Sequence, residues 1–148
     1  VGKGLAKYLV HTGRMLNAAD ALAMGLIDGI VSHDDIDAIL DGTLAPSVHR
    51  IGTPAEPWKG IAAFFERNGI EELLAGKHGG NGIAPAEVER ILGTLQRKAP
   101  LALRIADKLI TDGRGCASEL EHLHTIFTSS DAMLGLSSIG KKVSYEGK

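Results

Sequence analysis

One stretch, residues 101–110, constrains the fold more than any other part of this 148-residue chain. Two apolar stripes run along it at helical spacing: Leu101, Ile105 and Leu109, and beside them Leu103, Ala106 and Ile110. Together the stripes cover about 200° of a helical wheel, whereas a helix that packs on one side needs roughly 100°. We therefore expect a helix that is buried between two layers or against a partner chain.

Helical patterns recur along most of the remaining sequence, separated by glycine and proline. They cover residues 3–11, 18–24, 36–40, 58–65, 70–75, 85–95 and 116–127, and a last helix begins at 129–131. Asn17 and Ser32 precede two of these patterns as N-caps, each followed three residues later by an aspartate. Residues 26–31 are short, apolar and β-branched, which predicts an extended segment. The sequence thus predicts a mainly α fold with at most one or two short strands.

Composition argues against several classes of function. The net charge of −2 gives no overall field that would attract nucleic acid or acidic lipid, and aromatic residues at 4% offer few surfaces on which bases could stack. No apolar run approaches the length of a membrane span. The single cysteine, Cys116, excludes an internal disulfide and suits a reducing compartment. We expect a cytoplasmic protein without a nucleic-acid partner.

No complete catalytic constellation is present, and no catalytic residue is assigned. Glu119-x-x-His122 and Glu121-x-x-His124 have the spacing of di-iron helices, but such sites need these motifs on separate helices. No metal site is therefore predicted. The glycine-rich residues 76–82 lack the spacing of a phosphate-binding loop and are interpreted as a flexible connector.

The helix pattern at 116–127 predicts an apolar face that includes Leu120 and Phe127, which we expect to be buried. Cys116 lies near the start of this helix and is interpreted as a buried structural thiol, not a nucleophile. His124 lies at the edge of the apolar face and is predicted to be a hydrogen-bonded interior histidine.

Lys141 and Lys142 follow Gly140 at the expected end of the last helix. Two readings are open. The lysines can interact favourably with the carboxyl end of a helix, or they can form a site for an anionic group of a ligand. The residues alone favour the first reading.

Two parts of the chain resemble the crotonase (enoyl-CoA hydratase/isomerase) superfamily. The first resembles the segment that follows the family's catalytic core, and the second resembles the family's closing segment. The matching residues are Thr12-Gly13-Arg14, Ala18-x-x-Ala21 and Gly25-Leu26-Ile27-Asp28 in the first part, and Ala99-Pro100-Leu101, Phe127-Thr128-Ser129-Ser130-Asp131 and Gly135-Leu136 in the second. These matches lie toward the two ends of the chain.

The resemblance implies the C-terminal helical part of a crotonase-like fold. Residues 1–40 would end the core region, residues 41–97 would be a helical insertion, and residues 98–148 would serve oligomerisation and cover the acyl-CoA site. The implied activity is enoyl-CoA hydration, within a bifunctional 3-hydroxyacyl-CoA dehydrogenase/enoyl-CoA hydratase of fatty acid β-oxidation. The family's catalytic residues would precede Val1, so the chain alone is expected to be inactive.

The resemblance also makes the second reading of Lys141 and Lys142 more attractive, because they would meet the adenosine-phosphate end of coenzyme A. The family's aromatic residue near that position is Ile139 here. The chain itself would carry no cofactor: an acyl-CoA thioester is the substrate, and NAD enters only with a dehydrogenase domain. A homo-oligomer is expected. Two alternatives stay open: a 3-hydroxyisobutyryl-CoA hydrolase-like enzyme, suggested by the extra helices at 58–75, and a non-catalytic helical protein-interaction module.

Overall fold

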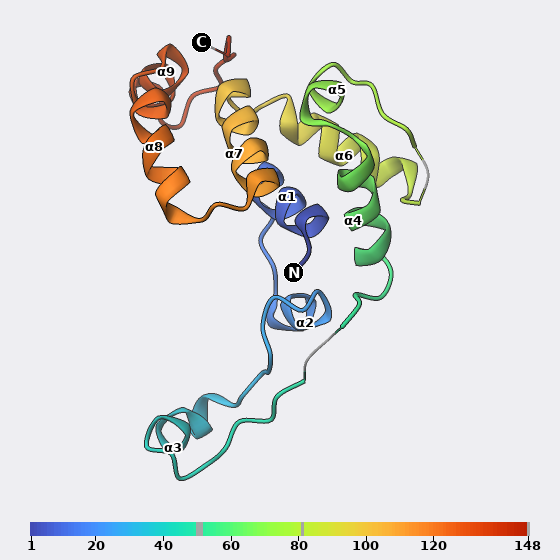
Figure 1. The fold of residues 1–148 in the computed structure, drawn as a ribbon, viewed down its shortest axis with the longest axis vertical. Helices are drawn as coiled ribbons and strands as arrows, with labels where there is room; N and C mark the ends of the chain where they lie inside the picture. Colours follow the sequence, from blue (N-terminus) through green and yellow to red (C-terminus); the bar gives the residue numbers. More distant parts are fainter. Residues whose placement is uncertain (50–51, 81, 148) are drawn as a thin grey trace.

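The computed structural model describes residues 1–49, 52–80 and 82–147, and the secondary structure in these ranges is entirely helical (Figure 1). The elements are α1 (Lys3–Thr12), α2 (Ala18–Ala23), the 3-10 helix η1 (His33–Asp35), α3 (Ile36–Leu40), α4 (Trp58–Arg67), α5 (Ile70–Leu74), α6 (Pro85–Leu95), α7 (Pro100–Asp112), α8 (Cys116–Phe127) and α9 (Ser130–Ser137). The predicted mainly α fold is confirmed.

Local capping signals explain where several helices begin and end. The Asn17 side chain accepts a hydrogen bond from the Asp20 backbone N–H at 2.7 Å, and Ser129 Oγ accepts one from Ala132 at 3.1 Å. Such caps satisfy amide groups that have no partner inside the helix. Gly13 ends α1 in the left-handed conformation, with φ of 64°, which glycine adopts without steric cost. These boundaries agree closely with the predicted ones.

In the segment predicted to be extended, residues 26–28 form bends and residues 29–31 have no regular secondary structure, and the described residues include no strand that pairs with them. It belongs to an arm, residues 26–49 with η1 and α3, that projects away from the remaining helices (Figure 1). The arm contains a backbone hydrogen bond of 2.6 Å from the His49 N–H to the Asp28 carbonyl. Leu26, Ile30 and Val31 remain partly exposed, because no strand among the described residues lies alongside them.

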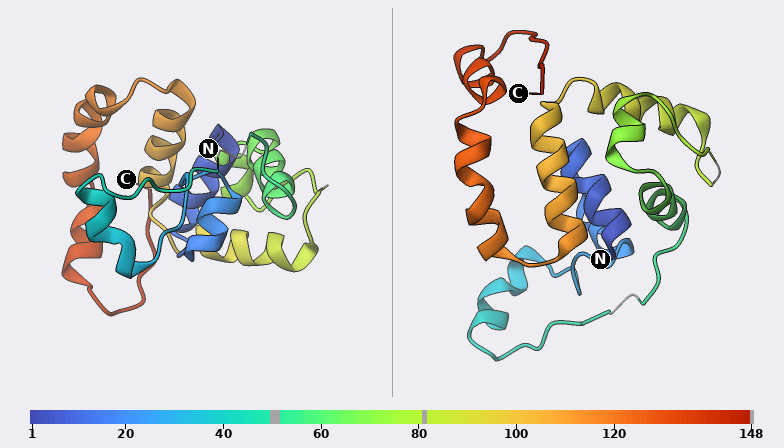
Figure 2. Two further views of the ribbon diagram at one scale, coloured as in Figure 1. Left: turned by 90° about the horizontal axis from the view of Figure 1, so that it is seen from below. Right: turned by 45° about the horizontal axis from the view of Figure 1, so that its top comes forward.

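The hydrophobic core is shared by α1, α4, α5, α6 and α7, with Met24 added beyond the end of α2. Its buried members are Leu5, Tyr8, Met24, Trp58, Ile61, Phe64, Phe65, Ile70, Leu73, Val88, Ile91, Leu95 and Leu103. Helix α1 lies between α4 and α7 (Figure 2). The approach of α1 to α4 is close, because a Cβ atom at Gly4 would lie 2.2 Å from the Ala62 carbonyl oxygen. The helices of the middle of the chain therefore build one core with α1 and α7.

Helix α7 occupies the two-sided position that its apolar stripes predict. It contacts α1 and α5 on one side and α8 on the other (Figure 2). Leu103 and Ile105 are buried, whereas Leu101 and Leu109 are only half-buried. The second layer is formed by α8, which contacts α7 and in turn contacts α9.

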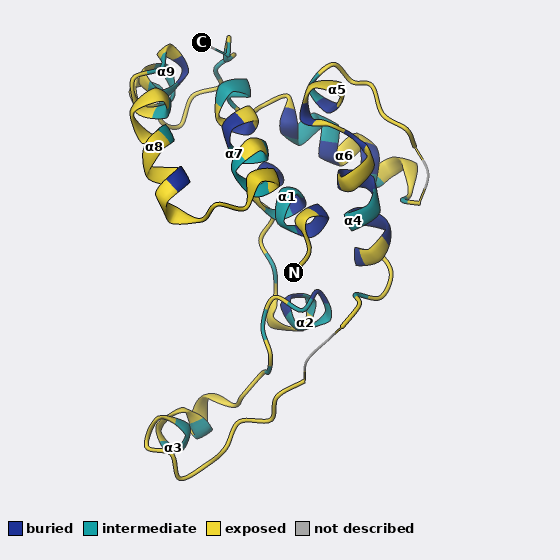
Figure 3. Cartoon of the chain, viewed as in Figure 1, coloured by how far each residue is buried: buried dark blue, intermediate teal, exposed yellow. Residues whose placement is uncertain are grey.

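The predicted burial of the apolar face of α8 is wrong for this chain. Leu120 is 68% exposed and Phe127 is 62% exposed, and most of α8 is solvent-accessible (Figure 3). Cys116 and His124 are also exposed, so their predicted interior positions are wrong too. The periodicity identified an apolar face correctly, but the only buried residue of α8 is Ser118, on a different part of its surface.

None of the described helices combines the length and the apolar character needed to cross a bilayer.

Candidate functional site

The two lysines singled out in the sequence lie in the C-terminal tail, which we define as residues 140–147. Both are exposed, and both line a hollow of about 410 Å³ whose other walls come from Arg97, Val143 and Tyr145. The tail begins with a turn, because the Lys141 backbone N–H donates to the Ser138 carbonyl at 2.9 Å. The structure thus places Lys141 and Lys142 beside a third cationic side chain from the connection between α6 and α7.

Asp131, in the first turn of α9, fixes the other end of the tail. Its two carboxylate oxygens accept hydrogen bonds from the backbone N–H groups of Glu146 and Gly147, each at 2.8 Å. Asp131 is only 3% exposed. The tail therefore turns back along α9 and does not extend into solvent.

A second hollow, of about 460 Å³, adjoins the first and shares Arg97 and Tyr145 with it. Helices α7, α8 and α9 and the tail enclose it. Its lining is mainly apolar and comprises Leu101, Ala102, Ile126, Phe127, Ala132, Gly135 and Leu136, with Lys98, Ala99, Ser129 and Asp131. Apolar side chains predominate in its lining, and it shares Arg97 with the hollow that Lys141 and Lys142 line.

This arrangement suits the binding of an amphipathic anion. Within the described residues, no ion pair joins Arg97, Lys141 or Lys142 to a carboxylate, so their charges are available to a ligand. Guanidinium and ammonium groups recognise phosphate and carboxylate oxygens, and the apolar lining of the second hollow can contact a hydrophobic part of the ligand. Among the described residues that line the two hollows, no nucleophile is paired with a general base, and we assign these hollows a binding role.

Sequence reasoning named the two lysines but missed Arg97 and Tyr145. Arg97 lines the same hollow as the lysines because the tail turns back, and the end of the tail is bound to Asp131 through Glu146 and Gly147. The sequence predicted a helix start at residues 129–131, and the structure shows Ser129 as its N-cap. Nothing in the local pattern indicated that Asp131 would also bind the tail.

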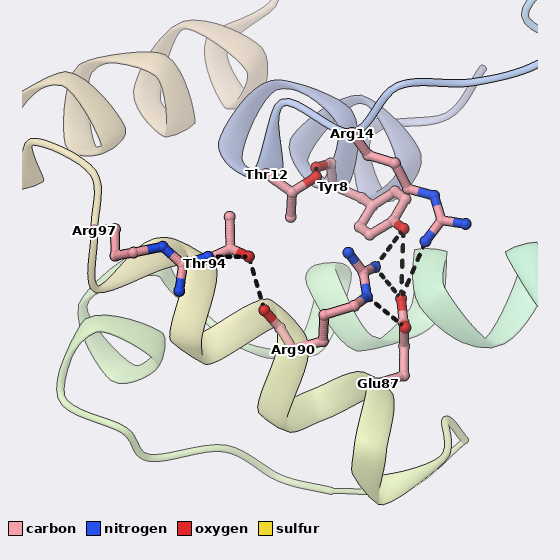
Figure 4. Close-up of polar contacts among 7 residues, drawn as sticks. All are labelled: Tyr8, Thr12, Arg14, Glu87, Arg90, Thr94 and Arg97. Atoms are coloured by element: carbon pink, nitrogen blue, oxygen red, sulfur yellow. Dashed lines mark hydrogen bonds and ion pairs between the residues drawn. The ribbon is translucent and has the colours of Figure 1, made fainter. Parts of the chain in front are cut away.

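A separate polar cluster joins α1 to α6 (Figure 4). Glu87 accepts hydrogen bonds from Arg90 and, at 3.4 Å, from the Tyr8 hydroxyl, and Arg14 Nη1 lies 4.0 Å from the same carboxylate. The hydrogen bond from Arg90 is the main cause of a lowered pKa at Glu87. Arg14 also stands over the Trp58 ring, with its guanidinium carbon 5.7 Å from the ring centroid. The cluster's charged groups are paired with one another, so we interpret it as a structural contact.

Other candidate motifs are not brought together into a site. Among the described residues, no group of three or more His, Cys, Asp or Glu side chains could hold a metal ion. The glycine-rich connector is partly fixed, since the Gly79 N–H donates to Asn68 Oδ1 at 2.7 Å. Its residue Asn81 lies outside the described residues. The two Glu-x-x-His motifs both lie on α8, as predicted.

A buried histidine lies where α1 meets α7. His11 is 1% exposed, and neither ring nitrogen has a hydrogen-bond partner among the residues that the structure describes. Its Nε2 lies 3.8 Å from Asp107 Oδ1, while Asp107 pairs with Lys7 at 3.0 Å. Burial lowers the pKa of His11; Asp107 opposes this effect and Lys7 adds to it. The neutral imidazole is therefore the form that the fold favours.

This environment predicts a pH-dependent stability. Because the pKa of His11 is lower in the folded state than the ordinary value of 6.5, the unfolded chain binds this proton more readily. Stability should be highest above that value and should fall as the pH drops below it. His11→Leu removes the titrating group and the unpaired polar atoms. We therefore expect the free energy of unfolding of this variant to exceed that of the parent by about 1–3 kcal/mol at pH 5.5 and by less at pH 8. Urea unfolding of both proteins at the two pH values measures the difference. If acidification lowers the free energy of unfolding equally in the parent and in the variant, the prediction is contradicted.

Comparison with known proteins gives one informative similarity. The chain is 38% identical over 80 residues to the probable enoyl-CoA hydratase echA17 of Mycobacterium avium (strain 104). The aligned region is 51% of this chain but only 30% of the relative, so the similarity spans less than a third of that protein's length. No family model matches the chain. No solved structure matches it either. The similarity supports a relation to the crotonase superfamily at the level of the sequence.

Proposed function

We propose that the chain is the C-terminal helical part of an acyl-CoA enzyme of the enoyl-CoA hydratase type, where it assembles subunits and covers the acyl-CoA site. The observation that carries the proposal is the uncovered apolar surface of α8, α9 and the residues that follow. Its exposed fractions are Leu120 68%, Leu123 42%, Phe127 62%, Met133 61%, Leu136 62% and Ile139 81%. Exposed apolar surfaces of this kind are typical of sites that contact another polypeptide, a membrane or a ligand, and we assign this one to contact with another subunit. The similarity to a hydratase supports the same assignment.

The groove beside the tail supports the second part of the proposal. Lys141 and Lys142 would bind the adenosine-phosphate end of coenzyme A, and Arg97 stands with them around the same hollow. A thioester with an acyl chain and a phosphorylated nucleotide combines apolar and anionic groups. This combination matches a mainly apolar hollow that adjoins one lined by Arg97, Lys141 and Lys142.

The finer assignment is the hydratase module of a bifunctional 3-hydroxyacyl-CoA dehydrogenase/enoyl-CoA hydratase in fatty acid β-oxidation. It rests on the resemblance of the short tail after Gly140. A 3-hydroxyisobutyryl-CoA hydrolase-like enzyme is the alternative, and helices α4 and α5 are the feature that favours it. A helical interaction module without catalysis is the remaining candidate, favoured by the same uncovered surface of α8 and α9.

Assays on the complete product of the gene that encodes the chain separate these candidates. We expect hydration of crotonyl-CoA, which is measured as the loss of the absorbance of its conjugated thioester. Reduction of added NAD in the same reaction identifies the bifunctional form. Release of free thiol from 3-hydroxyisobutyryl-CoA, without hydration, identifies the hydrolase. Absence of both reactions from a folded, purified product would contradict the proposal and leave the interaction module.

A further inference from the structure

We propose that Asp131 is a positioning residue for an anion-binding site formed by Arg97, Lys141 and Lys142. The inference rests on the proposed function, which gives the tail lysines a phosphate group to bind. It adds that the site exists only while the tail is held against α9 and α7. The ligand class is a multiply charged phosphate, either free or as part of a larger molecule.

The contact at Asp131 fixes both the position and the direction of the tail. Oδ1 accepts from Glu146 and Oδ2 accepts from Gly147, so one carboxylate holds two successive peptide units. Hydrogen bonds to an ionised acceptor are about twice as strong as neutral ones. Because Asp131 is buried, water competes poorly for these bonds.

The tail is also fitted closely between α9 and α7. Gly147 has φ of 79°, and a Cβ atom there would lie 3.0 Å from Arg104 Nη1 and 3.3 Å from Pro100 Cβ. On the other side, a Cβ atom at Gly135 would lie 3.2 Å from the Tyr145 hydroxyl. Two glycines therefore permit the close approach of the tail to the two helices.

The anchors determine where the lysines stand. The turn at Ser138 fixes the start of the tail, and Asp131 fixes its end, so the residues between them pass beside Arg97. Arg97 contributes its guanidinium from a different part of the chain, where its Nη2 donates a long hydrogen bond of 3.4 Å to Thr94 (Figure 4). Without the contact at Asp131, Lys141 and Lys142 would lose their fixed place next to Arg97.

This role can be distinguished from a simple effect of charge, because the two predict opposite results. Asp131 is an anion close to an anion-binding site, so its charge alone opposes binding, and its neutralisation should then tighten binding. If Asp131 acts by positioning the tail, its neutralisation should weaken binding instead. Asp131→Asn therefore gives a result whose sign decides between the two.

The experiment is calorimetric titration of the 148-residue chain with inorganic pyrophosphate and, separately, with coenzyme A. We expect Asp131→Asn and Gly147→Ala to weaken binding of pyrophosphate about tenfold, the fold-change for loss of one charge-assisted contact. Gly147→Ala changes no charge. Asp112→Asn makes the same charge change at an exposed carboxylate that pairs with Lys108, and it should leave the affinity within about twofold. Hydrogen exchange should show faster exchange of the Glu146 and Gly147 amides in the first two variants only, while all three keep the helical circular dichroism of the parent.

Each outcome bears on one of the two proposals. Weaker pyrophosphate binding in both tail variants supports the positioning role of Asp131. Coenzyme A that binds the parent no better than pyrophosphate counts against the acyl-CoA assignment, but it leaves the positioning role supported. Binding of pyrophosphate that is unchanged or tighter in Asp131→Asn overturns the positioning role, and it leaves the acyl-CoA assignment standing where the parent chain binds coenzyme A. A parent chain that binds neither probe overturns the anion site itself.

Discussion

Replacing Phe65 by alanine should lower the free energy of unfolding by about 3–5 kcal/mol, whereas Phe127→Ala should change it by about 0.5 kcal/mol or less. Phe65 is 1% exposed and its ring meets those of Tyr8, His11 and Phe64, with centroids 5.6–6.0 Å apart. Its removal leaves a cavity where α1 packs against α4. Phe127 is 62% exposed, so its truncation removes little apolar surface that is buried within the single chain.

Comparing these two variants tests the structure, because both replace a phenylalanine by alanine and differ only in how deeply that phenylalanine is buried. Urea unfolding followed by circular dichroism gives the two free energies at a concentration low enough to exclude self-association. Sedimentation at higher concentration provides a second measurement, in which the proposed assembly predicts weaker association for Phe127→Ala. A loss of monomer stability at Phe127 as large as that at Phe65 would contradict the exposed position of α8.

The helix boundaries could be predicted because the signals that set them are local. Asn17 and Ser129 accept hydrogen bonds from amides three residues away, and Gly13 ends α1 through its own backbone conformation. Pro85 and Pro100 each stand at the start of a helix. None of these interactions depends on a distant part of the chain, so the sequence pattern was sufficient.

Burial was harder to predict because periodicity shows which face of a helix is apolar, but not what covers that face. Leu103 and Leu120 both belong to apolar stripes, yet Leu103 is 5% exposed and Leu120 is 68% exposed. Leu103 belongs to the core cluster, in which α7 packs against α1 and α5, whereas Leu120 lies outside that cluster. The same reasoning applies to residues 26–31, since a segment rich in β-branched residues forms a strand only where another strand lies beside it.

The candidate site was predicted in part for a related reason. Lys141 and Lys142 are neighbours in sequence and could be singled out as a pair. Arg97 and Tyr145 join them only through the fold, and the hydrogen bonds at Asp131 that bring the tail back span 15 and 16 residues. Contacts of that range leave no periodic trace in a single sequence.

Close packing of α1 against α4 leads to a second large expected effect, and here a glycine is the sensitive position. Gly4→Ala should lower the free energy of unfolding by about 1–3 kcal/mol or more, because the new Cβ atom would meet the Ala62 carbonyl oxygen at 2.2 Å. The obstructing atoms belong to the backbone of a helix and cannot rotate away. The two helices must therefore separate, and this would loosen the packing of Leu5 and Tyr8.

Gly93→Ala is the matched control, since it makes the same substitution within α6. The nearest atom to its new Cβ would be Arg97 Nη1 at 4.0 Å, so no clash results. Alanine in the interior of a helix is favoured over glycine by roughly 0.5–1 kcal/mol, so this variant should be more stable than the parent. Thermal and urea unfolding of the two variants should therefore shift in opposite directions. If both gain stability, α1 and α4 do not approach as closely as the structure shows, and the core must be arranged differently at this contact.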